Sequence, residues 1–393
     1  MNTIDIRTGN IRDVISLLRF SDGMTKRDLA QLTNLSFSTV GSICNALAEL
    51  GLLEELPVSI YRVGRTPKLV RLKPLSCLTI CLNFERKDVM DLAVLRTNNE
   101  ILYFEQFNTS DCRSIEELVC FAHEKFRALK ETQAWFPQAS FLGVGVSVSG
   151  VFDKETRRIV NSAIPTMENK LVTDMVEKIF RLPCYVDNEA NLCAVAISQK
   201  EVGTTNLLYL HLSEGAGVGV VCEGNLLRGN LGYAAEIAHM PLGTIQRQCP
   251  SCGNYGCVEP DLCVQGLVED FEGALEPGQT FGVRWQAISN RILHAENDFT
   301  RQYVQRKGEL VGMVLSILIN LFDPQEVFVG GEICSIYEKI EPVIESVLQK
   351  RCMVYGKGRT RLRCDLNGNR NIILGLNQIM FERWNPFTDT LET

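Results

Sequence analysis

The sequence predicts a small helical head followed by a larger body of mixed α/β class. The chain has 393 residues, 45% of them hydrophobic and 22% charged, and this length is too great for one compact core. Apolar residues recur at helical spacing in the first fifty residues, whereas apolar strands alternate with helical stretches beyond Pro74. Regular elements of the body are expected at 142–148, 172–180, 184–187, 206–212 and 217–222.

The chain has no segment with the composition of a targeting signal or a membrane span. No charged start leads into an apolar run, and no stretch approaches the roughly 18 uninterrupted apolar residues that a bilayer requires. We therefore expect a cytoplasmic protein without membrane insertion. Most of the fifteen cysteines stand singly in apolar surroundings, which favours buried, reduced thiols over disulfides at Cys77, Cys81, Cys184, Cys193 and Cys222.

Charge is unevenly distributed along the chain. Residues 1–73 hold ten Lys/Arg and seven Asp/Glu, a net charge of +3, and the total of −7 leaves −10 for the remainder. A weakly basic head on an acidic body permits nucleic-acid binding by the head alone. Ordinary scatter of charge explains the same numbers equally well, so the argument must come from sequence pattern.

Three helices are expected in the head. The first is amphipathic and ends at the turn 21–23, and its apolar residues are Ile11, Val14, Ile15, Leu17 and Leu18. The second begins at Thr25, where Thr25 and Asp28 have the spacing of a capping box, and its inward face consists of Leu29, Ala30 and Leu32. Ser36 can cap the third, whose inward residues are Val40, Ile43, Leu47 and Leu50.

The outward face of the third helix is typical of a DNA-recognition helix. It presents Ser38, Thr39, Ser42 and Asn45, which are small polar residues that can enter the major groove. A hairpin-like stretch follows, and its cations Arg62, Arg65 and Lys68 suit a wing on the phosphate backbone. We therefore interpret residues 1–73 as a winged helix-turn-helix DNA-binding domain. A plain three-helix bundle is the alternative.

A cluster of metal-ligand residue types lies in the second half of the body. Cys249, Cys252 and Cys257 fall within nine residues, and His239 precedes them by ten. A Cys₃His set with no open position suits a structural zinc ion. Unrelated cytosolic cysteines or a redox Cys-x-x-Cys pair are the alternatives, and Cys257 and His239 argue against the second.

The chain resembles the ROK family of repressors and sugar kinases. The resemblance rests on Ala-Ala-Glu-Ile-Ala-His at 234–239, on Gly-Cys-Val-Glu at 256–259, on the glycine-containing strand 143–150, on Val-Asp-Asn-Glu-Ala-Asn at 186–191 and on the wing sequence. It implies a two-lobed actin/hexokinase-like (ribonuclease H-like) domain after the head. The first lobe would span 74–204 and the second, with the zinc loop, 205–393, and the C-terminal helix would return to the first lobe.

The resemblance also implies ligands and partners. Sugar hydroxyls would contact Asn188, Glu189, Glu236, His239 and Glu259, and His239 would also bind the zinc. Carboxylates and imidazole suit this role because each can fix the direction of a donated hydroxyl hydrogen. The expected partners are operator DNA and a sugar or sugar derivative. A winged-helix reader of palindromic sites is expected to be a homodimer or a dimer of dimers.

Three departures from the family's kinases favour a regulator without catalytic activity. The first phosphate turn lacks its glycines and carries Glu85, the second carries Glu214, and Glu189 replaces the aspartate that serves as base. A carboxylate repels phosphate, and a misplaced base can cost on the order of 10²-fold in rate. The function expected is therefore a sugar-responsive transcriptional repressor. An ATP-dependent sugar kinase and a zinc-braced module sequestered by a protein partner are the alternatives.

Overall fold

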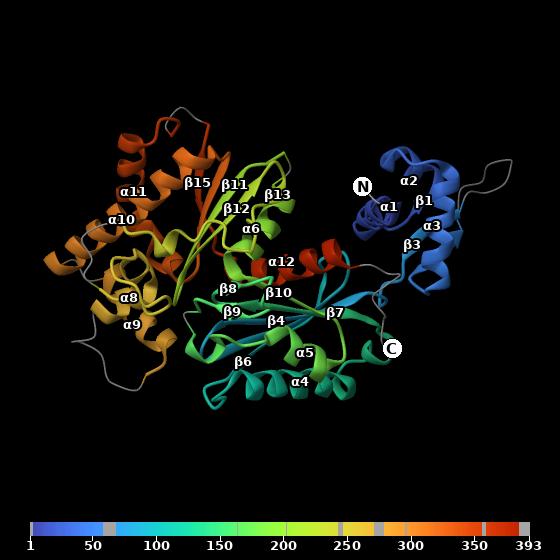
Figure 1. The fold of residues 1–393 in the computed structure, drawn as a ribbon, viewed down its shortest axis with the longest axis horizontal. Coiled ribbons are helices and arrows are strands. Elements are labelled where there is room, and N and C mark those ends of the chain that lie inside the picture. The colour runs from blue at the N-terminus through green and yellow to red at the C-terminus, as the bar shows by residue number, and fades with distance from the viewer. Residues whose placement is uncertain are drawn as a thin grey trace.

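The head of the computed structural model contains three helices and a small sheet (Figure 1). The structure describes residues 3–57, 68–162, 164–201, 203–242, 247–270, 279–294, 297–355 and 359–384, so Arg62 and Arg65 of the expected wing lie outside it. The helices are α1 (Thr3–Arg19), α2 (Lys26–Thr33) and α3 (Phe37–Glu49). The strands β1 (Met24–Thr25), β2 (Leu53–Pro57) and β3 (Lys68–Leu72) pair antiparallel in the order β1-β3-β2.

The helix starts in the head are confirmed. Thr25 accepts a hydrogen bond from the N–H of Asp28 in a complete capping box, and the Ser36 hydroxyl accepts one from the N–H of Thr39. The prediction that Leu32 and Leu50 are buried is wrong, because Leu32 is 58% exposed and Leu50 is 42% exposed. Leu50 is the C-cap of α3, where the chain leaves the helix. The structure gives no reason for the exposure of Leu32.

The predicted α/β class is confirmed by two five-stranded sheets, each with helices on both faces. The sheet of lobe 1 has the order β10-β7-β4-β5-β6. Its strands are β4 (Leu78–Arg86), β5 (Val89–Leu95), β6 (Ile101–Asn108), β7 (Phe141–Val148) and β10 (Cys184–Asn188), and the outer face is covered by α4 (Ile115–Thr132) and α5 (Val172–Phe180). Short elements complete the lobe, namely η1 (Phe136–Gln138), β8 (Val151–Phe152), β9 (Ile159–Val160) and η2 (Pro165–Met167).

The sheet of lobe 2 has the order β13-β12-β11-β14-β15. Its strands are β11 (Leu207–Leu212), β12 (Ala216–Cys222), β13 (Asn225–Leu226), β14 (Glu326–Gly330) and β15 (Arg361–Cys364). The outer helices are α7 (Glu259–Leu262), α8 (Val264–Asp270), α9 (Phe281–His294), α10 (Asp298–Phe322) and α11 (Tyr337–Arg351), with the short turns η3 (Ile237–His239) and η5 (Glu332–Ile336). All five regular elements expected in the body are therefore present, 172–180 as a helix and the others as strands.

Two helices lie between the sheets and join the lobes. They are α6 (Glu189–Lys200) and α12 (Gly368–Arg383), and they share one apolar core with the inner faces of both sheets. Close packing of the two helices depends on glycine, because a Cβ on Gly375 would overlap the carbonyl oxygen of Leu192. The sandwich therefore has five layers, with helices outside each sheet and two helices between them.

The C-terminal end of α12 packs against the head (Figure 1). Apolar residues of α1 and α3 form a single core with Leu142, Met380, Phe381 and Trp384. Arg19 of α1 lies over the Phe381 ring and donates hydrogen bonds to the Thr97 carbonyl and to Gln378. The head is thus packed against lobe 1 and is not merely tethered to it.

The structure also bears on the cysteines and on the length of the apolar helices. Cys77, Cys81, Cys184 and Cys193 are buried, and Cys222 is half-buried. None of the helices in the described ranges is both long and apolar enough to cross a membrane.

Candidate functional site

The four residues expected to bind a metal come together in lobe 2. His239 lies at the end of η3, and Cys249, Cys252 and Cys257 lie on the loop before α7. Their donor atoms all lie within 4.8 Å of one another, with 3.6 Å between Cys249 Sγ and His239 Nδ1 and 3.6 Å between the sulfurs of Cys252 and Cys257. A tetrahedral zinc with Zn–S bonds of about 2.3 Å requires sulfur pairs about 3.8 Å apart, so the donor set fits zinc.

The metal loop is joined directly to the residues expected to contact sugar. Cys249 Sγ lies 3.0 Å from Glu259 Oε2, and His239 Nε2 lies 3.8 Å from Glu236 Oε2. Glu259 is buried and begins α7. The loop turns sharply at Gly253 and Gly256, whose φ angles of 74° and 82° are in the left-handed region that favours glycine. An ion held by this loop would therefore fix the positions of His239 and Glu259 as well.

All five expected sugar contacts line one cavity between the lobes. The cavity is lined by Asn188, Glu189, Glu236, His239 and Glu259, together with Ser149, Gly150, Asn161 and the backbone of 215–217. Asn188 and Glu189 come from the junction of β10 and α6, whereas the other three belong to lobe 2. The cavity has a volume of about 30 Å³, which is room for about two water molecules. A sugar can enter only if the lobes or the lining side chains move.

Two carboxyl groups of this cavity, Glu189 and Glu236, have raised pKa values. Burial raises the pKa of Glu189 to about 7, against the opposing charge of His211. Burial and the charge of Glu259 raise the pKa of Glu236 to about 7. In the described structure Glu189 Oε2 is buried without a hydrogen-bond partner, and a ligand hydroxyl would satisfy this oxygen.

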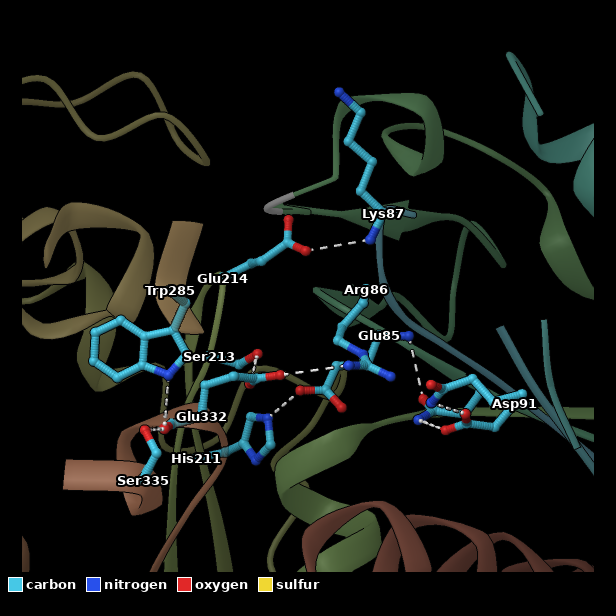
Figure 2. A network of polar contacts seen from close by, with 12 residues as sticks. Glu85, Arg86, Lys87, Asp91, His211, Ser213, Glu214, Trp285, Glu332 and Ser335 are labelled. Carbon is cyan, nitrogen blue, oxygen red and sulfur yellow. Dashed lines mark hydrogen bonds and ion pairs between the residues drawn. The ribbon is translucent and has the colours of Figure 1, made fainter. Parts of the chain in front are cut away.

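A second polar cluster crosses the lobe interface where the resemblance put the two phosphate turns (Figure 2). Glu85 of β4 contacts His211 Nε2 of β11, and both side chains are fully buried. The next two residues of lobe 1 also reach lobe 2: Arg86 Nη1 lies 3.9 Å from Glu332 Oε1, and the N–H of Lys87 donates to Glu214 Oε1 at 3.3 Å. The lobes are therefore linked here by the chain's own charged groups.

Burial and mutual contact set the charges in this cluster. Burial opposes the charge on Glu85, but His211, Arg86 and Ser213 together outweigh burial and lower the pKa of Glu85. Burial lowers the pKa of His211, but Glu85, Glu189 and Glu332 together raise it to about 9. Burial raises the pKa of Glu214 to about 7 and also raises that of Glu332. The centre of the cluster is therefore an ion pair surrounded by carboxyl groups with raised pKa values.

Sequence analysis missed His211 and Glu332. Glu85 and Glu214 were identified only as residues that would repel phosphate, and their partners lie more than 100 positions away along the chain. One local signal was present, because His211 is the single polar side chain apart from Tyr209 in the otherwise aliphatic strand Leu207–Leu212. A basic or polar residue at a buried position of a strand usually has a partner.

Four of the residues expected to read DNA lie on α3, and the hydroxyls of Ser38 and Thr39 each lie 2.8 Å from the Ser36 hydroxyl. Ser38, Ser42 and Asn45 are exposed, and Thr39 is half-buried. Asn45 Oδ1 accepts a hydrogen bond from Lys26 at 3.3 Å, which brings a cation of α2 to this face. The Lys68 ammonium of β3 pairs with Glu55 of β2, so its charge is partly neutralised within the small sheet of the head.

Comparison with known proteins places this architecture among regulators and sugar kinases. The sequence pattern of the ROK family matches residues 85–379. The chain is 24% identical to the xylose repressor of Caldicellulosiruptor bescii over 368 residues, which is 90% of each chain. A solved ROK family transcriptional regulator, a homologue of the E. coli MLC protein, covers 96% of this chain with a TM-score of 0.75 and 18% identity. A ROK family glucokinase from Streptomyces griseus covers 77% with a TM-score of 0.62 and 21% identity.

Proposed function

The chain belongs to the ROK family, and on this premise we propose that it is a transcriptional repressor that binds operator DNA and responds to a sugar or sugar derivative. The observation that carries the proposal is that one chain combines a head and a body with two different candidate binding surfaces. The head exposes a row of small polar residues on α3, and the body encloses a cavity with three carboxylates beside a Cys₃His cluster. Likeness to a xylose repressor over 90% of the chain, a share that extends into the head, supports the same function.

Kinase activity is disfavoured by the cluster between the lobes. Glu85, Glu214 and Glu332 would face the phosphates of a nucleotide bound at these turns, and repulsion would oppose that binding. The carboxylate of Glu85 also contacts His211, and this contact links the two lobes without a nucleotide. The glucokinase likeness extends over 77% of the chain at 21% identity and so reflects the common fold.

A zinc ion in this protein would have a structural role. His239, Cys249, Cys252 and Cys257 would hold it, and the bound ion would brace the loop against its neighbours. The chain's own residues do the rest: Glu236 and Glu259 accept hydroxyl hydrogens, while Asn188 and Glu189 bring the other lobe to the ligand. Because the cavity now holds about 30 Å³, binding favours a different lobe arrangement from this one.

The signal would reach the head through α12. This helix packs between the lobes and ends in the core that it shares with α1. A change in lobe arrangement therefore changes the support of the head, and in a homodimer it would alter the spacing of the two recognition helices. A repressor of this kind acts where the DNA is, which fits the expected cytoplasmic location.

The test is selection of DNA from a random library, followed by mobility-shift titration with a panel of neutral, amino and phosphorylated monosaccharides. Asn45→Ala should change the preferred sequence, whereas Arg65→Ala, chosen from sequence alone, should weaken binding to every sequence and reduce its salt dependence. Gln286→Ala, an exposed amide on α9, is the matched control and should change neither. Absence of any preferred sequence, or equal effects of all three substitutions, would contradict the proposal.

A further inference from the structure

A second cavity lies beside the candidate sugar cavity and has the opposite charge. Its volume is about 330 Å³, and Asn188 lines both cavities. The other lining residues are Phe152, Lys154, Val186, Asp187, Asn191, Arg228, Gly232 and Arg383. They come from both lobes and from the end of α12, so the cavity lies at the junction of the two lobes.

Two guanidinium groups in this cavity share one carboxylate. Arg228 Nη1 contacts Asp187 Oδ2, and Arg383 Nη2 lies 3.7 Å from the same oxygen. The other oxygen, Oδ1, accepts hydrogen bonds from the N–H of Asn188 at 3.0 Å and from the Asn191 amide at 2.9 Å. Asp187 is therefore held in place by lobe 1, and it orients two cations that its single charge cannot neutralise.

The excess of positive charge affects Arg383 in particular. Burial lowers the pKa of this guanidinium, and although Asp187 opposes the effect, the nearby Arg228 adds to it. Lys154 supplies a third cation at the rim, and among the described residues its ammonium makes no ion pair within 4 Å. The lining residues include three cations and one carboxylate, so positive charge is in excess in this partly enclosed space even though Glu382 also acts on Arg383.

We propose that this cavity is a subsite for an oxyanion, a phosphate monoester or a carboxylate, which binds next to the sugar cavity. Guanidinium groups donate paired hydrogen bonds that match the geometry of phosphate and carboxylate oxygens. Because Asn188 lines both cavities, a sugar phosphate or sugar acid can occupy the two together. The inference rests on the proposed function for the sugar half of such a ligand, whereas binding of the anion depends only on the cations.

An anion here would act on the joint between the body and the head. Arg383 is the last residue of α12, and its carbonyl oxygen accepts a hydrogen bond from Arg12 of α1 at 3.4 Å. The next residue, Trp384, is 2% exposed in the core shared with the head. An anion that draws Arg228 and Arg383 away from Asp187 would therefore loosen a contact between lobes and shift the end of α12.

The first experiment measures binding of inorganic phosphate to the full-length, zinc-containing protein by calorimetry, against sodium chloride at equal ionic strength. Phosphate should bind to the natural protein, and Arg228→Gln and Lys154→Gln should each weaken it by about tenfold or more, because each removes a charge-assisted hydrogen bond. Lys178→Gln, an exposed lysine on α5, is the control and should leave the affinity unchanged. Lys154 is exposed, so its substitution tests the site even where Arg228→Gln disturbs folding.

The second experiment identifies the source of the anion by comparing each neutral monosaccharide with its phosphate and its uronic acid. An anionic sugar that binds at least about tenfold more tightly than its neutral parent, with the advantage lost in Arg228→Gln, supports a charged effector. Phosphate that binds equally well without the sugar supports a separate small anion. Failure of phosphate to bind, together with equal affinities for neutral and anionic sugars, overturns the subsite. A neutral sugar that still releases operator DNA would then leave the proposed function intact.

Discussion

Removing the imidazole of His211 should destabilise the protein far more than removing the carboxylate that it contacts. At pH 7 His211→Gln leaves Glu85 buried with its charge unpaired or forces it to take up a proton. With an ordinary pKa of 4.5 for glutamate, protonation at pH 7 costs about 3 kcal/mol at 1.36 kcal/mol per unit. Glu85→Gln leaves an imidazole with an ordinary pKa of 6.5, which becomes neutral at pH 7 at almost no cost. We therefore expect His211→Gln to lose about 3 kcal/mol more than Glu85→Gln.

The same pair predicts how stability depends on pH. The pKa of His211 is raised in the folded state from 6.5 to about 9, so its contribution is complete below about pH 6.5 and is lost as the pH rises through 9. The pKa of Glu85 is lowered, so its contribution is present above pH 4.5 and is lost only at more acidic pH. The unfolding free energy should therefore fall by about 3 kcal/mol between pH 6.5 and 9.5.

Urea unfolding followed by tryptophan fluorescence suits this measurement, because Trp285 donates a hydrogen bond to the Glu332 carbonyl beside the pair. The single variants and the double variant complete a double-mutant cycle. His294→Gln, on the exposed end of α9, is the control and should keep the natural pH profile. Equal losses in the two single variants, or an unchanged alkaline slope in the double variant, would refute the assignment of an ion pair.

Three further outcomes follow from the site and the head. The purified protein should show no sugar-dependent ATP turnover in a coupled assay, because Glu214 lies at the second phosphate turn, and phosphorylation of any hexose would contradict this. Cys257→Ser should lose zinc by elemental analysis and lose sugar response while it still shifts operator DNA, and a zinc-free variant with a normal response would break the proposed link. Arg19→Ala should destabilise the head by about 2 kcal/mol and speed its removal by protease, because the bond to Gln378 is lost, whereas the exposed Arg27→Ala should not.

The sequence was sufficient wherever neighbouring residues determine the structure. Thr25 and Ser36 cap helices through backbone groups three residues away, so their spacing alone predicts the helix starts. The candidate metal cluster could also be predicted, because three of its four residues fall on one short loop. The candidate sugar cavity could be predicted only from the family resemblance, since Glu189 and Glu236 come from different lobes and no local pattern relates them.

Contacts between residues far apart in the chain could not be predicted from the sequence. Glu85 was identified as an obstacle to phosphate, yet its role as partner of His211 depends on how two sheets face each other. The same holds for Arg228 and Arg383, which converge on Asp187 from positions 155 residues apart in the chain. A cation in a loop and another at a helix end are each unremarkable in sequence, and only the fold makes them neighbours.

Helix α12 connects the candidate sugar cavity with the head that we propose binds DNA. Helix α6 begins at the cavity with Glu189 and packs so closely on α12 that Gly375 admits no side chain. Helix α12 then ends in the apolar core that contains Trp384 and residues of α1. Since interiors are close-packed, we expect lobe movement at the cavity to displace α12. We therefore expect the head to move with the helix, so that a ligand that favours one lobe arrangement would change how the proposed repressor binds DNA.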